Sequence, residues 1–311
     1  MNKTVLTLTV NPAIDRTITV DRLVFGDRSY IVSRTDAAGG RGINAARVLT
    51  NFGASAIAIT TSGRHNPKFE EHLRKDSFGK EIIKIRHNIR INLTIQDSQG
   101  LSIKLNEAGP SVTQAEQNRV LKGVEKLLPE ASWLMLCGSV PPGVDSHFYT
   151  KLIDMAAKHD VETLLDTDGD ALLHGMEGEP TVVKPNQSEA ERLLNRVLLT
   201  RTHCIEAVHQ IKAMGAQCVV LSLGSRGAVA AWSEGVLEVV PPQVEAISPI
   251  GSGDALGAAM VWALGRGDSF PEALRWGVAA GTASSKLPGL GLAGVEQTKE
   301  IYQQTQVTTV A

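Results

Sequence analysis

Short apolar segments alternate with helical patterns through the second half of the chain, and this order restricts the fold more than any other feature. Segments typical of buried strands lie at residues 133–137, 164–166, 182–183 and 219–223, with helical spacing between them. Strands that alternate with helices in this way indicate a parallel sheet with helices on both faces. We therefore expect an α/β fold, and 311 residues suffice for one large domain or for a domain with an appendage.

Capping residues predict where several helices begin. In a capping box, two side chains three residues apart satisfy backbone N–H groups reciprocally. Three pairs have this spacing: Thr113 with Glu116, Asn186 with Glu189, and Ser269 with Glu272. The last of these helices is expected to reach about residue 284. A further helix is predicted over residues 39–52, and residues 228–232 with 237–240 predict a hairpin.

A second group of strands lies outside the alternating pattern. Residues 17–20 and 29–33 are short, β-branched and partly polar, which is typical of half-exposed strands. Residues 89–105 predict a hairpin, because residues 89–96 alternate apolar with polar and residues 97–100 supply a turn. We expect these segments to form a small β lid beside the main sheet.

One turn combines small residues with a carboxylate at the start of a helix. Gly251-Ser252-Gly253-Asp254 precedes a helical run rich in small apolar residues. The first N–H groups of a helix have no partner within it and favour anions, and glycines let a phosphate approach the backbone. The turn therefore predicts a phosphoryl-anion hole, with Asp254 as a general base beside it. The alternative is that Asp254 only caps the helix, which is common.

Two further positions near the N-terminus suit a sugar ligand. Glycines at 39, 40 and 42 open a helix, and Asn44, one turn later, offers both a donor and an acceptor. Asp15 follows the first strand, residues 4–10, and ligands in such folds bind beyond the carboxyl ends of strands. The alternatives are structural, with Asn44 merely exposed beside a tight turn and Asp15 a solvated turn acid.

Composition and charge exclude several classes of protein. The net charge of −2 gives no electrostatic case for nucleic acid or for an anionic membrane. Three cysteines are too few for a disulfide framework and fit a reducing cytoplasm. We find no signal-peptide pattern and no apolar run long enough for a membrane span. There is no P-loop, and the one GxGxxG, at residues 289–294, lacks the strand–turn–helix context of a dinucleotide site, so we interpret it as a loop.

Six motifs in order resemble the phosphofructokinase-B (ribokinase-like) family of carbohydrate kinases, over nearly the whole chain. They lie at residues 11–15 (NPAID), 39–44 (GGRGIN), 138–143 (GSVPPG), 184–189 (KPNQSE), 222–227 (SLGSRG) and 251–254 (GSGD). Each motif alone is weak, but all six at this length are a strong signal. The NPAID start and the SxPPG segment resemble the branch that phosphorylates sugar phosphates, which includes 1-phosphofructokinase, tagatose-6-phosphate kinase and the minor 6-phosphofructokinase.

The resemblance implies a three-layer sandwich, with a mainly parallel central sheet and a β lid formed by segments of about 14–35 and 88–107. Residues 1–311 would then be one kinase domain. Lids in this family often pair between subunits, which implies a homodimer. ATP and Mg²⁺ are the implied cofactors, and neither nucleic acid nor a membrane is an expected partner.

The resemblance also implies roles for individual residues. Asp254 would be the base, and Gly251, Ser252 and Gly253 would form the anion hole. The residues implied to bind the sugar are Asp15, Gly40, Asn44 and Ser139, with Arg90 and Arg28 gripping its phosphate from the lid. The residues implied on the nucleotide side are Lys184, Asn186, Glu189, Ser222, Gly224, Gly227, Gly281 and Ser284. Glu189 is the expected magnesium ligand, through water.

Two departures from the family pattern stand out. Arg41 replaces the usual lysine of GGKG, and because a guanidinium is planar and larger, we expect phosphate contact there to differ. Ser248-Pro249 stands where Asp-Thr is usual, which bears on cation binding nearby.

The implied activity is ATP-dependent phosphorylation of a ketohexose phosphate, with fructose 1-phosphate converted to fructose 1,6-bisphosphate. Tagatose 6-phosphate or fructose 6-phosphate are alternative substrates, and a kinase of nucleosides or unphosphorylated sugars is another alternative. A sugar-phosphate-binding regulator without catalysis is the alternative from a different class. An ordinary aspartate pKa of about 4 would leave Asp254 ionised at neutral pH.

Overall fold

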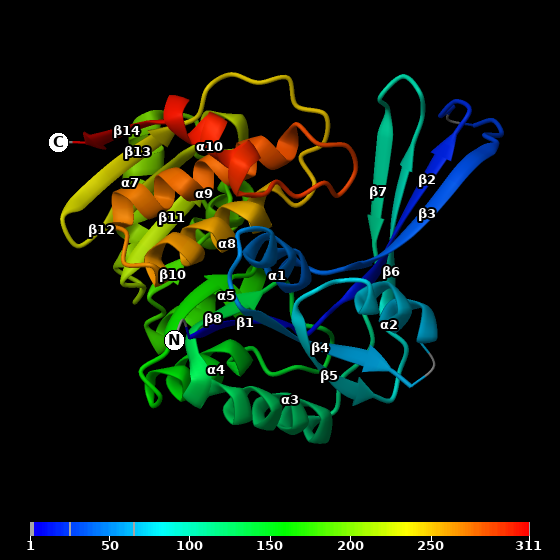
Figure 1. Cartoon of the computed structure of the whole chain (residues 1–311), viewed down its shortest axis with the longest axis horizontal. Helices are drawn as coiled ribbons and strands as arrows, with labels where there is room; N and C mark the ends of the chain where they lie inside the picture. Colours follow the sequence, from blue (N-terminus) through cyan, green and yellow to red (C-terminus); the bar gives the residue numbers. More distant parts are fainter. Residues whose placement is uncertain (1–2, 25, 65, 311) are drawn as a thin grey trace.

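The computed structural model describes residues 3–24, 26–64 and 66–310, which form a central sheet flanked by helices and a separate small sheet (Figure 1). The central sheet has ten strands in the order β14-β13-β12-β11-β10-β9-β8-β1-β4-β5. Its strands are β1 (Thr4–Thr9), β4 (Ala56–Gly63), β5 (Gly79–Ile85), β8 (Ala131–Cys137), β9 (Glu162–Asp166), β10 (Val182–Val183), β11 (Cys218–Ser222), β12 (Ala228–Trp232), β13 (Gly235–Val240) and β14 (Gln306–Val310). Strands β5 to β11 along this order pair in parallel, and β12, β13 and β14 add antiparallel strands at one edge.

Helices cover both faces of the central sheet, which confirms the predicted sandwich. They are α1 (Arg41–Asn51), α2 (Pro67–Arg74), α3 (Gln114–Leu127), α4 (Phe148–Ala157), α5 (Gly169–Gly175), α6 (Gln187–Leu194), α7 (Arg201–Lys212), α8 (Ser252–Gly265), α9 (Phe270–Ser285) and α10 (Val295–Gln304). One hydrophobic core lies between the sheet and α1, α8 and α9, and a second lies between the sheet and α3, α4, α5 and α7. No helix within the described ranges is long and apolar enough to cross a membrane.

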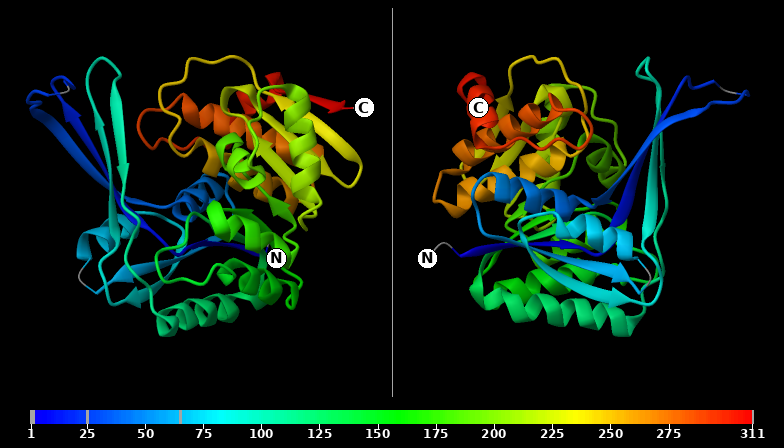
Figure 2. Two further views of the ribbon diagram at one scale, coloured as in Figure 1. Left: turned by 180° about the vertical axis from the view of Figure 1, so that it is seen from behind. Right: turned by 45° about the vertical axis from the view of Figure 1, so that its right-hand side comes forward.

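The small sheet stands away from the body of the molecule, as the two views of Figure 2 show. Its four strands run in the order β3-β2-β6-β7, with bounds β2 (Ala13–Val20), β3 (Ile31–Gly39), β6 (Arg90–Gln96) and β7 (Ser102–Asn106). Strand β3 continues to Gly39, well beyond the expected end at residue 33, and leads directly into α1. At the base of this lid, Ala13 pairs with both Gly39 and Arg90.

Two of the three predicted capping boxes form. Both reciprocal hydrogen bonds are present at the start of α3 and at the start of α6. At α9 the predicted start and end are confirmed, because Ser269 is the N-cap residue and the helix reaches Ser285, but Ser269 makes no capping bond. The reason is that the carboxylate of Glu272 turns away to contact the hydroxyl of Tyr302, and Pro271 occupies the first turn instead.

Helices α8 and α9 pack with their backbones close together. A Cβ added at Gly277 would lie 2.7 Å from the carbonyl oxygen of Leu256, and one added at Gly281 would lie 2.8 Å from that of Ser252. Both distances are too short for any side chain. The glycines of α9 therefore set the position of the turn at the start of α8.

Candidate active site

Polar residues gather at one edge of the central sheet, where its parallel strands end. These residues follow or end five strands: Asn11 (β1), Ser139 (β8), Asp166 (β9), Lys184 (β10) and Ser222 (β11). Helices α1 and α8 begin near the same edge. Ligands of open α/β sheets bind beyond the carboxyl ends of the strands, so this edge is where a substrate site is expected.

The turn before α8 has the geometry of an anion site. Gly251 is the N-cap residue in a left-handed conformation, with φ of 79°, which glycine adopts without strain. Within the described residues, the N–H groups of Gly253 and Asp254 have no hydrogen-bond partner. The hydroxyl of Ser252 is also buried without a partner. Three polar groups are therefore available to a ligand at this helix end.

Asp254 lies in the first turn of α8 and is partly exposed, although protein atoms surround its carboxylate on most sides. Desolvation, and then the negative charge of Asp166, raise the pKa of Asp254 to about 7. A hydrogen bond from Asn44 and the charges of Arg41 and Lys184 oppose this rise. The expectation of an ordinary pKa was therefore wrong. At neutral pH this carboxylate exchanges protons readily, which suits a general base.

Asn44 has its amide fixed from both ends. Its Nδ2 donates to Oδ2 of Asp254 over 2.8 Å, and its Oδ1 accepts from Nη1 of Arg47 over 3.1 Å. Because arginine can only donate, this pair fixes which end of the amide faces Asp254. Arg47 also donates to the carbonyl of Ala38 at the end of β3 and pairs with Asp76. Asn44 is buried, so it holds the carboxylate and is not the exposed residue of the structural alternative.

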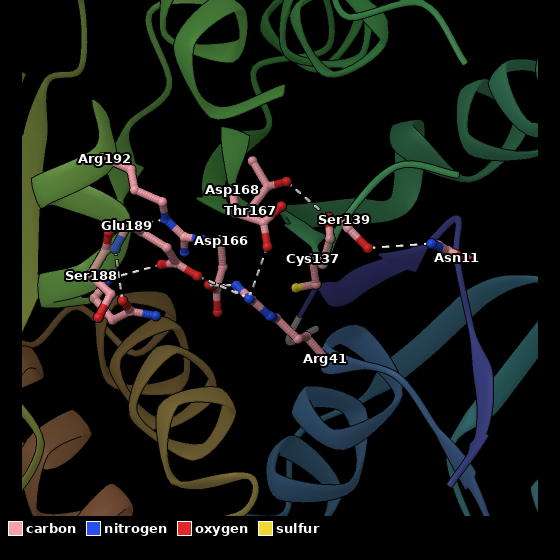
Figure 3. A network of polar contacts seen from close by, with 12 residues as sticks. Asn11, Arg41, Cys137, Ser139, Asp166, Thr167, Asp168, Ser188, Glu189 and Arg192 are labelled. Carbon is pink, nitrogen blue, oxygen red and sulfur yellow. Dashed lines mark hydrogen bonds and ion pairs between the residues drawn. The ribbon is translucent and has the colours of Figure 1, made fainter. Parts of the chain in front are cut away.

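A network of charges joins Arg41 to Asp166, Asp168 and Glu189 (Figure 3), and the charges of Asp166 and Arg41 act on the pKa of Asp254. Asp166 is buried and accepts from Arg41 and from Lys184, each over 2.9 Å. Arg41 also donates to Glu189 over 2.9 Å and contacts Asp168 at 3.4 Å. Burial alone would raise the pKa of Asp166, but Lys184 and Arg41 hold it below its usual value. The charges are thus largely compensated within the network.

The expected role of Arg41 changes with this arrangement. Its guanidinium is occupied by carboxylates and ties α1 to β9 and α6. A planar fork can reach two carboxylates at once, which a lysine could not do with the same geometry. The residue that lies under the anion site is Lys184, because its Nζ would be 3.8 Å from a Cβ at Gly253.

The base of the lid supplies a second polar cluster. Asp15 on β2 accepts from Asn92 over 3.0 Å, and a Cβ at Gly39 would collide with its carboxylate at 1.9 Å. Burial raises the pKa of Asp15. Arg90 donates to the carbonyls of Asn11 and Glu107, and its Nε is buried without a partner.

Arg28 is the one implied sugar-phosphate residue that the structure places elsewhere. It is exposed in the loop between β2 and β3, at the far end of the lid from Arg90. Strand β2 has eight residues and therefore spans about 26 Å. Arg28 and Arg90 cannot contact one substrate within a single protomer in this conformation.

The remaining implied residues form the edge and floor of the site. Ser139 accepts from Nδ2 of Asn11 at 3.3 Å, and Gly40 is the N-cap of α1. Glu189 is buried, and its carboxylate accepts from the backbone N–H of Asn186 over 2.8 Å. Residue Asn186 itself is exposed. The capping role and a contact with water-bound Mg²⁺ can coexist, because each carboxylate oxygen has a second lone pair.

The nucleotide-side residues fall into two groups. Ser222 ends β11, and Gly224 and Gly227 flank the short turn η3 (Gly224–Arg226) that follows it. Gly281 and Ser284 are buried in α9 instead, and the hydroxyl of Ser284 accepts from the N–H of Ala293 over 3.0 Å. For both groups, contact with a nucleotide stays a prediction.

Sequence reasoning missed several residues of the site. Asp166 ends a strand that was predicted, so the rule that strand ends carry ligands could have found it. Arg47 and Asn92 lie in recognised elements but have no motif around them. Four of the seven buried polar atoms without a partner among the described residues belong to this site: Asn11 Oδ1, Arg90 Nε, Asn92 Oδ1 and Ser252 Oγ. Such orphans concentrate where a ligand satisfies them.

Comparisons with known proteins agree over nearly the full length. A family model described as pfkB family carbohydrate kinase matches residues 6–297. A 1-phosphofructokinase of Vibrio cholerae is 29% identical, and the match covers 100% of this chain and 98% of that protein. A tagatose-6-phosphate kinase of Staphylococcus epidermidis is 28% identical, and the match covers 98% of this chain and 100% of that protein. The tetrameric inhibited form of Escherichia coli phosphofructokinase-2 superposes with a TM-score of 0.89 at 30% identity, covering 97% of this chain and 98% of that chain.

Proposed function

Because the chain belongs to the pfkB family of carbohydrate kinases, we propose that it transfers a phosphoryl group from ATP to a hydroxyl of a ketohexose phosphate. Fructose 1-phosphate is the proposed substrate and fructose 1,6-bisphosphate the product. The names of the two relatives, a 1-phosphofructokinase and a tagatose-6-phosphate kinase, support this class of substrate. The observation that carries the proposal is a carboxylate with a pKa of about 7 beside unpaired amides at a helix N-terminus.

In the proposed mechanism, Asp254 accepts the proton of the attacking hydroxyl. That oxygen then forms a bond to the γ-phosphorus of ATP as the bond to the β-phosphate oxygen breaks and ADP leaves. Asn44 holds Asp254 in place through the 2.8 Å hydrogen bond. Positioning and electrostatics are the main sources of catalysis in phosphoryl transfer, so the fixed geometry matters more than new covalent chemistry.

The amides of Gly253 and Asp254, with the hydroxyl of Ser252, would hold the oxygens of the migrating phosphoryl group. Lys184 lies beneath them and adds a positive charge. Removing one such donor typically costs about 10²–10³ in rate. The carboxylates of Asp168 and Glu189 are of the type that Mg²⁺ prefers, and Glu189 would contact its water shell while phosphates of ATP supply the other ligands. Bound Mg²⁺ would neutralise charge on those phosphates.

The substrate's existing phosphate is assigned to Arg90. Its Nε is an unsatisfied donor at the base of the lid, and a guanidinium fork fits phosphate geometry. Asp15 and Ser139 would bind sugar hydroxyls. An enzyme for unphosphorylated sugars or nucleosides would not need this cation.

We also propose that the lid pairs with the lid of a second copy. Exposed apolar side chains at both edges of the small sheet support this. At the β3 edge they are Tyr30, Ile31 and Val32, and at the β7 edge they are Leu101 and Leu105. Each of these side chains is more than 50% exposed. Arg28 can serve its implied role only across such a dimer, in the site of the other protomer. Oligomerisation has a precedent in a relative, since the Escherichia coli phosphofructokinase-2 structure is named as a tetrameric form.

A substrate panel tests the proposed function. Purified protein with MgATP is assayed against fructose 1-phosphate, fructose 6-phosphate and tagatose 6-phosphate, which differ in phosphate position or in one stereocentre. We expect the highest kcat/KM with fructose 1-phosphate; preference for another member would correct the substrate but keep the reaction. Turnover of none of them would support the non-catalytic regulator instead.

Two variants test the residue assignments. Asp254→Asn is expected to lower kcat by at least about 10³, since it removes the proton acceptor. Arg90→Ala is expected to raise the KM for the sugar phosphate by more than about tenfold through loss of a charge-assisted contact, with a smaller effect on the KM for ATP. Equal turnover by Asp254→Asn and wild type would show that the catalytic assignment is wrong. An unchanged sugar KM in Arg90→Ala would favour an unphosphorylated substrate.

A further inference from the structure

A cluster of two histidines and a glutamate lies outside the kinase site. His147 precedes α4, His174 lies at the end of α5, and Glu177 lies in the 3₁₀ turn η2 (Met176–Gly178) that follows. One ligand atom from each residue lies within 4.8 Å of the others. We propose that these three side chains bind a divalent transition metal ion, with Zn²⁺ as the best match and water at the fourth position.

The distances suit such an ion after a small adjustment. Nε2 of His147 lies 3.5 Å from Oε2 of Glu177, and Nδ1 of His174 lies 2.8 Å from Oε1. Zinc binds histidine nitrogen and carboxylate oxygen at about 2.0–2.2 Å, so neighbouring ligand atoms of a tetrahedron stand about 3.3–3.6 Å apart. The first pair already has this separation. The second pair involves the other oxygen of Glu177, so the carboxylate must turn or bind through both oxygens, and this pair must open by roughly 0.5–0.8 Å.

The imidazole of His147 is oriented by groups behind it. Its Nδ1 faces the hydroxyl of Ser146 at 3.2 Å and a carboxylate oxygen of Asp145 at 3.4 Å. A proton on Nδ1 shared with these acceptors leaves the lone pair on Nε2, which faces Glu177. Metal-binding histidines usually have such a carboxylate or hydroxyl partner on the second nitrogen.

The backbone that carries the cluster is held firmly. Asp145 accepts from the N–H of His147 over 2.8 Å and pairs with Lys151 over 2.7 Å. The hydroxyl of Thr150 donates to the carbonyl of His174 over 2.7 Å, which ties α4 to α5. The two imidazole rings lie with centroids 4.1 Å apart. The ligands are therefore brought together by the fold and do not depend on a flexible loop.

The donor set selects the kind of ion. Two imidazoles with one carboxylate suit Zn²⁺ and its neighbours in the first transition row, whereas Mg²⁺ prefers oxygen ligands alone. The magnesium that accompanies ATP should therefore not compete. A bound ion would brace the segments that run from Ser139 to α4 and from Asp168 to the end of α5, both of which begin at the kinase site.

Metal binding to the whole protein tests the proposal. Protein freed of metals is dialysed against Zn²⁺ in the presence of excess Mg²⁺, and bound zinc per chain is measured. We expect one Zn²⁺ per chain in the wild type and in the control His209→Gln, which alters an exposed histidine on α7. His147→Gln and His174→Gln should each lose that ion, and Glu177→Gln should bind it more weakly.

Two further readouts distinguish zinc bound at this cluster from zinc bound elsewhere on the protein. Co²⁺ should give the strong visible bands of a tetrahedral site in wild type but not in His174→Gln. Zn²⁺ should raise the midpoint of thermal unfolding of wild type by mass action and leave that of His174→Gln unchanged. Circular dichroism and kinase turnover with MgATP establish that each variant is folded. Equal zinc binding by wild type and His174→Gln, or no zinc bound in excess Mg²⁺, would overturn the proposal.

Discussion

At the scale of single residues, Asp254 shows how the fold changes the acidity of one carboxyl group. Burial and the neighbouring charge of Asp166 raise its pKa to about 7, while Asn44 holds it by a hydrogen bond that favours the charged form. A carboxylate with this pKa is half protonated at neutral pH. It is a stronger base than an ordinary aspartate and still ionised often enough to accept a proton.

This predicts the pH dependence of the reaction. We expect kcat/KM to fall about tenfold per pH unit below an apparent pKa near 7, because protonated Asp254 cannot act as a base. Initial rates between pH 5 and 9 measure the profile. In Asn44→Ala the apparent pKa should move upward, since the hydrogen bond that stabilises the carboxylate is gone. A flat profile from pH 5 to 8 in wild type would contradict the assignment.

The same group predicts an effect on stability. The pKa of Asp254 is higher in the folded protein than its usual value of 3.8, so the folded state binds the proton more tightly. Its contribution to stability is therefore fully present below pH 3.8 and is lost as the pH rises through about 7. Asp254→Asn should be more stable than wild type at pH 8, by about 1–2 kcal/mol after allowance for partial exposure, with the difference shrinking toward pH 5.

Thermal unfolding at the two pH values measures this difference. Asp154→Asn, at an exposed position on α4, is the matched control and should leave the unfolding midpoint unchanged at both. If Asp254→Asn is less stable than wild type at pH 8, the charged form of Asp254 does not destabilise the folded protein, and the assignment of a raised pKa to Asp254 is wrong.

At the scale of secondary-structure elements, the contact between α8 and α9 positions the anion site. Gly281 of α9 faces the carbonyl of Ser252 in the first turn of α8, so the two backbones meet where the phosphoryl group would bind. The family resemblance implies a place near adenine for Gly281. Its position in the core gives it a packing role that is sufficient to require glycine.

Gly281→Ala should therefore displace the start of α8. The new Cβ would lie 2.8 Å from a backbone oxygen, which cannot move without shifting the turn. We expect kcat to fall by at least about tenfold, because catalysis of phosphoryl transfer depends on positioning, while the KM for the sugar changes little. Steady-state kinetics measure both constants.

Gly123→Ala is the matched control for this change. Gly123 lies in α3, and a Cβ there would have ordinary contacts with Ile83 at 3.5 Å. Alanine should stabilise that helix by up to about 1 kcal/mol and leave kcat unchanged. A Gly281→Ala enzyme with wild-type kcat would show that α9 does not set the geometry of the anion site.

The sequence predicts the elements well and their long-range contacts poorly. Strand β9 and the turn at Gly251 can both be found in the sequence, because each has a local signal in apolar pattern or small residues. Arg41 meets Asp166 and Glu189, which are 125 and 148 residues away in sequence. That meeting depends on the order of strands in the sheet, which no local pattern specifies.

At the scale of the whole molecule, the lid is a small sheet with little of its own core. Val32 is 68% exposed and Ile31 is 65% exposed on strand β3, so apolar surface is left open to solvent. A sheet of this size is marginally stable alone and gains from a partner that covers such a surface. The proposed lid-to-lid dimer supplies that cover.

Val32→Asp is expected to break this dimer. A charge at the centre of an apolar interface is costly to bury, so the protein should become monomeric by sedimentation or light scattering. The KM for the sugar phosphate should rise, while the KM for ATP should change less. Leu199→Asp, at a position that is 77% exposed between α6 and α7, is the control and should keep the oligomeric state of wild type. A wild type that is already monomeric at assay concentrations would contradict the dimer.

Strand β3 of the lid leads through Gly40 into α1, and Asn44 in the first turn of α1 donates a hydrogen bond to Asp254, the proposed proton acceptor. The small sheet is thus connected to Asp254 through a short stretch of chain. Arg47 braces this stretch, because it donates hydrogen bonds to the carbonyl of Ala38 and to Oδ1 of Asn44. In the proposed kinase, a sugar that moved the lid would also displace the amide of Asn44, which holds Asp254. The proposed sugar site and the acidity of Asp254 would then be coupled through fewer than ten residues of continuous chain, from the end of β3 to Asn44.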